Sequence, residues 1–158
     1  MADIIADGYV KVGWVTTLSS LSSPTAVQVT AGVDLESFLT PDGLGIELGD
    51  EAVDTSALNS TFSTEKAGRG TVSIELTFKD QGQGNAPWTT FATRGSAGYL
   101  VVRTGVAATT DWAAGQKIDI YSVAYGDRKP IAPAANEVAK FSIQLFSTAD
   151  PVIAVAMV

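Results

Sequence analysis

Alternation of apolar and polar residues is the dominant pattern along this chain. It is clearest in residues 71–79, where Val72, Ile74, Leu76 and Phe78 are separated by polar residues. A period of two places these apolar side chains on one face, so the segment is expected to be a half-buried strand. Shorter alternating segments, enriched in β-branched and aromatic residues, predict further strands at 9–16, 27–32, 98–104, 117–125 and 138–147. Residues 44–48, 52–54 and 151–157 could add more strands.

Residues 85–94 interrupt the alternation and predict one helix. Asn85 or Ala86 can cap it, Pro87 suits its first turn, and Gly95 can end it. Its apolar residues recur at helical spacing and form a narrow stripe that would pack on a sheet: Trp88, Phe91 and Ala92. Residues 34–39 could form a single helical turn.

The predicted elements fit one mainly β domain, a β-sandwich or barrel-like fold with one flanking α-helix. A length of 158 residues suits a single domain spanning 1–158, and a hydrophobic content of 46% is enough for a core. Within it we expect an N-terminal arm at about 1–8 and a long acidic loop region at about 34–60. Charged residues make up only 17%, which suggests that much of the surface is covered by other subunits.

Charge is distributed unevenly. Residues 1–80 hold 12 of the 17 acids and 4 of the 10 bases, and no base lies between Lys11 and Lys66. One region of the surface should therefore be strongly negative. A net charge of -7 weighs against a protein that grips nucleic acid through clustered Lys and Arg.

The absence of cysteine and histidine removes much enzyme chemistry, including thiol nucleophiles, imidazole bases and the usual zinc ligands. Carboxylates alone could form a glycosidase pair or a Ca²⁺ site, but the spacing of Asp50, Glu51 and Asp54 is not that of a calcium loop. Trp14 and Trp88 are expected in the core, whereas Trp112 could be an exposed platform for a sugar ring. Neither a signal peptide nor a membrane span is expected.

The order of segments resembles the major tail tube proteins of long non-contractile-tailed bacteriophages, especially those of actinobacteria. The resemblance covers about residues 30–150. It is carried by residues 34–48, 52–61, 67–81, 85–95 and 114–129, and most clearly by SAGYLVVRTG (96–105) and AANEVAKFSIQLF (134–146).

This resemblance implies a structural virion protein, not an enzyme, without cofactor or metal. Such subunits form hexameric rings that stack into the tail tube, where strands of all subunits build a β-barrel around the DNA channel. The implied partners are further copies of the chain, the tape measure protein and other tail proteins. DNA would pass without specific binding, no membrane is involved, and synthesis would occur in the host bacterial cytoplasm.

Two sets of charged residues are candidates for assembly or for the channel wall. An acidic lumen would repel DNA, so part of one set is expected to face the channel: Glu47, Asp50, Glu51, Asp54 and Glu75. The acid-rich first half could meet bases of a neighbouring copy, for which Arg128 and Lys129 are the candidates. Two alternatives stay open: a non-catalytic β-sandwich binding or virion decoration module, and a hydrolase that uses only carboxylates.

Overall fold

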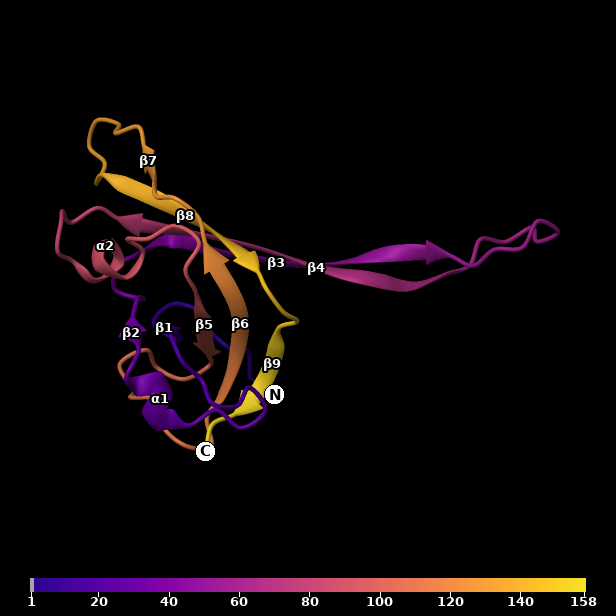
Figure 1. The fold of residues 1–158 in the computed structure, drawn as a ribbon, viewed down its shortest axis with the longest axis horizontal. Helices are drawn as coiled ribbons and strands as arrows, with labels where there is room; N and C mark the ends of the chain where they lie inside the picture. Colours follow the sequence, from indigo (N-terminus) through magenta and orange to yellow (C-terminus); the bar gives the residue numbers. More distant parts are fainter. Residues whose placement is uncertain (1) are drawn as a thin grey trace.

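The computed structural model describes residues 2–158 and confirms a mainly β chain (Figure 1). Two short helices, α1 (Ala26–Thr30) and α2 (Ala86–Thr90), accompany nine strands. The strands are β1 (Val10–Val15), β2 (Val33–Asp34), β3 (Leu39–Asp54), β4 (Glu65–Lys79), β5 (Ala97–Thr104), β6 (Lys117–Tyr125), β7 (Lys129–Ile131), β8 (Lys140–Ser147) and β9 (Val152–Ala156). The strands expected at 9–16, 71–79, 98–104, 117–125 and 138–147 are all present, within one or two residues or as part of a longer strand.

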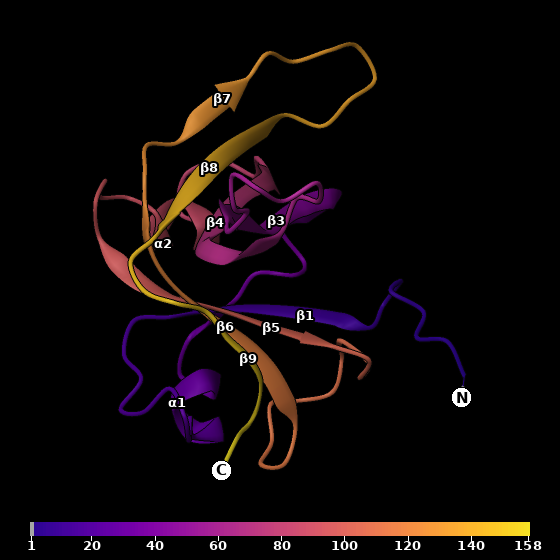
Figure 2. The same cartoon turned by 90° about the vertical axis from the view of Figure 1, so that its right-hand side faces the viewer.

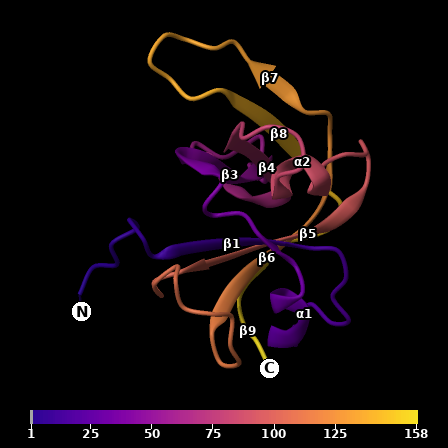
Figure 3. The same cartoon turned by 90° about the vertical axis from the view of Figure 1, so that its left-hand side faces the viewer.

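All strands belong to one antiparallel sheet of order β2-β1-β5-β6-β8-β4-β3, with β9 paired to β6 and β7 to β8. Its two halves are joined by a short ladder, in which Val123, Ala124 and Tyr125 of β6 pair with the end of β8. Figures 2 and 3 show the half containing β1, β5 and β6 below the half containing β3, β4 and β8. The sheet therefore turns at the β6–β8 junction.

One hydrophobic core receives side chains from both halves of the sheet. Phe91, which directly follows α2, packs against Trp14 of β1 with ring centroids 5.1 Å apart and against Phe78 of β4 at 5.6 Å. Gly98 of β5 makes room for the Trp14 indole, because a Cβ at this position would overlap the ring. Phe91 and the half-buried Trp88 of α2 thus close the core, as predicted, whereas Ala92, the third residue of the predicted stripe, is exposed.

A second core lies on the other face of β1, β5 and β6. It joins Val29 of α1, Trp112 and Met157 to the outward side chains of these strands. The C-terminus is fastened there, because Ala26 donates its backbone N–H to Val158 O at 3.0 Å and Val158 donates to Pro24 O at 2.9 Å. β1 is consequently buried on both faces, although its alternation indicated a half-buried strand.

Two helical expectations need correction. Residues 27–32 were expected to be a strand but belong largely to α1, because Thr25 caps a helix: its hydroxyl accepts from Gln28 N at 3.3 Å. The β-branched residues of this segment favour a strand, and the cap together with burial of Val29 overrides that preference. α2 is shorter than expected and ends at Thr90, and the flanking helix is one of two. Residues 36–38 form a turn, with Phe38 N donating to Leu35 O.

The region expected as an acidic loop at 34–60 is mostly strand. β3 runs through it for 16 residues and pairs with β4, although its ladder is irregular between Asp50 and Ala52. The residues of β4 that precede Ser73 do not pair with β8. Residues 49–71 therefore leave the body as a two-stranded arm (Figure 1). Acidic and glycine residues conceal this strand from pattern analysis, since both are depleted in strands.

Candidate assembly surfaces

The arm, defined as residues 49–71, is exposed along its whole length and belongs to neither core. Its tip, residues 55–64, contains no charged residue. Hydrogen bonds hold the tip in shape: Thr55 N donates to Thr64 O at 2.9 Å, Thr64 N to Ser56 Oγ at 2.9 Å, and Phe62 N to Ser60 Oγ at 3.2 Å. A projecting, internally bonded hairpin is suited to making contacts outside its own chain.

Asp54 fixes the junction between the strand and the tip. Its carboxylate accepts a hydrogen bond from the backbone N–H of Ser56 at 2.8 Å. This bond, and next the Ser56 side chain, lower the pKa of Asp54 below its ordinary value. Across the ladder Asp54 lies opposite Glu65, and like charges in such a pair destabilise an isolated hairpin.

The structure divides the five candidate acids into two groups. Glu47 pairs with Ser73, and Glu75 pairs with Gly45, so both carboxylates lie on the face of the body sheet turned away from the core. This face is polar, with Thr71, Ser73 and Thr77 on β4. The other three acids, Asp50, Glu51 and Asp54, belong to the arm.

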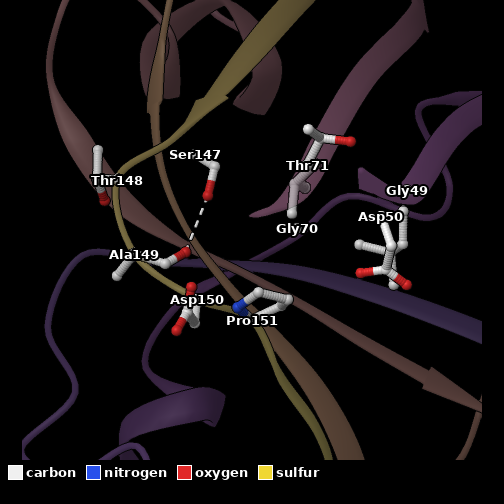
Figure 4. A pocket seen from close by; sticks show the side chains of 11 residues that line it. Gly49, Asp50, Gly70, Thr71, Ser147, Thr148, Ala149, Asp150 and Pro151 are labelled. Carbon is white, nitrogen blue, oxygen red and sulfur yellow. Dashed lines mark hydrogen bonds between the residues drawn. The ribbon is translucent and has the colours of Figure 1, made fainter. Parts of the chain in front are cut away.

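Asp50 lines a groove at the base of the arm, with a volume of about 550 Å³ (Figure 4). Gly49, Gly70 and Thr71 form the arm side, and residues 147–151 form the other side, where Asp150 lies. Ser147 Oγ donates to Ala149 O at 2.8 Å and shapes this opposite wall. The groove exists because the chain turns away from β4 after β8, which leaves β4 without a neighbour on that side.

The two candidate bases differ in their surroundings. The Arg128 guanidinium stacks on Trp88 with its carbon 3.8 Å from the ring centroid, and Nη1 donates to Trp88 O at 3.3 Å. Lys129 begins β7 and is exposed. Arg128 is therefore engaged within its own chain, whereas Lys129 is the accessible base of the two.

A buried polar cluster was not foreseen from the sequence. Arg103 is 1% exposed, and its guanidinium donates to the carbonyl oxygens of Ala107, Thr110 and Asp111 and to Gln116 Oε1, at 2.8 to 3.2 Å. Burial lowers the pKa of Arg103, while Glu36, Asp34 and Asp111 act in the opposite direction. This cluster fixes the β5–β6 connection. No sequence spacing could have signalled it, because most of its acceptors are backbone atoms.

Trp112 belongs to the same region and is not a platform. It is 7% exposed, its Nε1 donates to Asp34 Oδ1 at 2.9 Å, and Lys11 and Arg103 lie over its ring. The alternative that placed this indole on the surface is therefore wrong. Across residues 2–158, no group of three or more potential metal-ligating side chains occurs, and no helix has the length and apolarity to cross a membrane.

An open sheet edge completes the candidate surfaces. β3 ends the strand order and has a strand partner only on its β4 side among the described residues. Such an edge presents backbone N–H and C=O groups to any strand laid beside it.

The sequence was compared with models of known protein families, and the family described as "Phage tail tube protein" matches residues 1–158. The chain belongs to the phage tail tube protein family.

A solved structure shares the fold of this tail tube protein. A chain of the "anti-feeding prophage (AFP) baseplate, 6-fold symmetrised", determined by cryo-EM, superposes with a TM-score of 0.63. The two chains are 10% identical, and the match covers 96% of each. At this identity the likeness shows a shared fold. The search of curated proteins gave no match.

Proposed function

We propose that this tail tube protein assembles into hexameric rings that stack into the tube of a phage tail, through which DNA passes into the host. The observation that carries this proposal is the match to the family over the whole chain, together with an arm that leaves the body and touches neither core. The fold shared with a component of a six-fold particle favours six subunits per ring.

The open edge of β3 supports ring closure by strand pairing. A long exposed edge is an aggregation hazard unless another chain covers it, and closing a sheet into a barrel removes the edge altogether. In the proposed ring, β3 of each subunit pairs with an open edge of the next, so that the sheets join into one barrel around the channel.

Within this barrel, Glu47 and Glu75 are the acids placed to face the lumen. They share the polar, core-distant face of the body sheet, while the arm acids lie farther out. Carboxylates on a channel wall would repel the phosphates of DNA over about 10 Å at ordinary salt, so DNA would slide without binding. A tube in which both side chains lie on the outer surface would contradict this placement.

The arm acids have a different proposed role, contact with bases of an adjacent copy. Asp50 and Asp150 line the groove in Figure 4, and Lys129 is exposed and able to enter it. Arg128, held by Trp88, would contribute at the rim. Charge reversal by Asp50→Lys with Glu51→Lys should weaken assembly more than folding. Adding Lys129→Glu should restore part of it, and unaltered assembly of the acid variant would refute the contact.

The wider proposal is a virion protein of a phage with a long non-contractile tail, of the kind that infects actinobacteria. Synthesis would occur in the host cytoplasm. The tape measure protein and other tail proteins would be its partners, and no catalysis, cofactor or membrane would be involved. The binding-module alternative loses its main support, since the Trp112 platform on which it relied is buried.

The test is negative-stain electron microscopy of the purified protein over a concentration series, with light scattering to give the mass in solution. Rings or tubes with a central channel that grow with concentration support the proposal. A particle that stays monomeric, or that closes as a small oligomer without a channel, contradicts it.

A further inference from the structure

The arm tip carries two large apolar side chains with no partner in their own chain. Leu58 is 106% exposed and Phe62 is 79% exposed. Both belong to the tip, and exposed apolar surface concentrated in one part of a monomer commonly marks an interaction site. Because the backbone between them is fixed by hydrogen bonds, little conformational entropy would be lost when the tip binds.

The N-terminal segment, residues 2–9, provides a hollow of matching character. The hollow has a volume of about 360 Å³ and is lined by Ala2, Asp3, Ile4, Ile5, Tyr9 and Gly105. Ile4 and Ile5 are 72% and 68% exposed, so this apolar surface is also uncovered in the single chain. Figure 2 shows the segment leaving the body beyond β1.

The hollow is formed before any partner arrives. Gly105 N donates to Tyr9 O at 3.0 Å, and Ala108 N donates to Gly8 O at 2.8 Å, which fastens the segment to the end of β5. The Ile4 side chain lies over Gly105, where an added Cβ would be 3.5 Å from it. The hollow is therefore closed on one side by Gly105 and is lined by apolar side chains, among them Ile4 and Ile5.

We infer that Leu58 and Phe62 of one copy insert into the N-terminal hollow of another copy. The tip is uncharged and apolar, as the hollow requires, and the hollow is large enough for aromatic insertion. β3 continues for five residues beyond Gly49, about 17 Å at strand spacing, so the tip lies well away from the groove at the arm base. The contact joins two different surfaces, which is the type that extends into rings or filaments.

This inference rests on the proposed self-assembly and names the contact that sustains it. The absence of cysteine permits a direct test by disulfide trapping, since two single-cysteine variants have no competing thiols. Ser63→Cys and Asp3→Cys proteins, which keep Leu58, Phe62 and Ile5, are mixed, assembled and oxidised. We expect an intermolecular disulfide dimer, because the bond forms only when the two Cβ atoms approach to about 4 Å.

The matched control mixes Ser63→Cys with Ile131→Cys, which places the second thiol at another exposed position, in β7. This pair should stay unlinked. Tubes that form with the control pair linked, or with neither pair linked, overturn the inference and leave the proposed function intact. A wild-type protein that does not assemble overturns both.

A second readout is the concentration at which tubes form. Phe62→Ser should raise it by about 10- to 100-fold, the effect of removing one buried apolar anchor from an interface. Val27→Ser is the matched control, because Val27 is also 79% exposed but lies on α1. It should leave the concentration unchanged, and an equal response of the two variants would contradict the inference.

Discussion

Removing the arm should abolish tube formation without weakening the folded body. Gly49 pairs with Thr71 across the ladder, so residues 50–70 can be replaced by an Asn-Gly turn that joins the two strands as a tight hairpin. None of the removed residues belongs to either core. The body should therefore keep its fold.

The expected change in stability follows from loop closure. Shortening the connection from 21 residues to two is a little over three halvings, each worth about 0.6 kcal/mol, so the body gains roughly 2 kcal/mol of unfolding free energy. The cross-strand residue pairs of the arm are lost as well, and each lost pair lowers the unfolding free energy by about 0.2 to 1 kcal/mol. The pair of Asp54 and Glu65 is the exception, because its loss removes a repulsion. Three other pairs are lost, so the net change should lie between about -1 and +1.5 kcal/mol.

Urea unfolding at concentrations below assembly measures the first expectation, and sedimentation with electron microscopy measures the second. A shorter control, in which only the tip residues 57–62 become a Gly-Ser linker, keeps the two strands and should lose assembly equally if the tip is the contact. Normal tubes from the armless protein would refute the assembly role. Destabilisation by more than about 1 kcal/mol would show that the arm belongs to the folding unit.

Three further predictions concern the body. Arg103→Met should destabilise the chain by about 3 kcal/mol, because the four hydrogen bonds of a buried guanidinium that hold the β5–β6 connection are lost. Arg128→Met should cost less than about 1 kcal/mol, and thermal unfolding compares the two variants. Gly98→Ala should cost about 1 to 3 kcal/mol by forcing Trp14 out of place, seen as a change in tryptophan fluorescence, and an unchanged spectrum would argue against this packing. Burial, and then Asp119, raise the pKa of Tyr121 above 10.0, so the stability this residue contributes is complete below pH 10 and is lost as pH rises through the folded pKa. Tyr121→Phe should flatten that alkaline loss in unfolding curves measured between pH 9 and 12, and identical curves would contradict the prediction.

Prediction from sequence worked where burial and local pattern agree. The alternation at 71–79 and the cap at Asn85 both act through local geometry, and both are found in β4 and α2. The segment at 27–32 misled because its β-branched residues favour a strand, while Thr25 and the C-terminal residues place them on a helix.

The assembly surfaces were harder to predict. Four of the five candidate acids lie within eight residues of the sequence, but only the register between β3 and β4 separates the acids on the body face from those on the arm. An arm that buries nothing in its own chain leaves no apolar alternation, because that alternation reflects burial of one strand face in a core. Likewise, the turn-like sequence around Arg128 predicts an exposed base, whereas its guanidinium stacks on Trp88, which lies 40 residues away in the chain.

The central claim is that six copies form a ring around a channel and that rings stack into a tube. Cryo-EM of tubes assembled from the purified chain tests it most directly. We expect six subunits per ring, strands of neighbouring subunits joined into one barrel, Glu47 and Glu75 on the lumen wall, and each arm lying on another copy. A filament without a channel, or a ring in which the arms contact no neighbouring copy, would contradict the account.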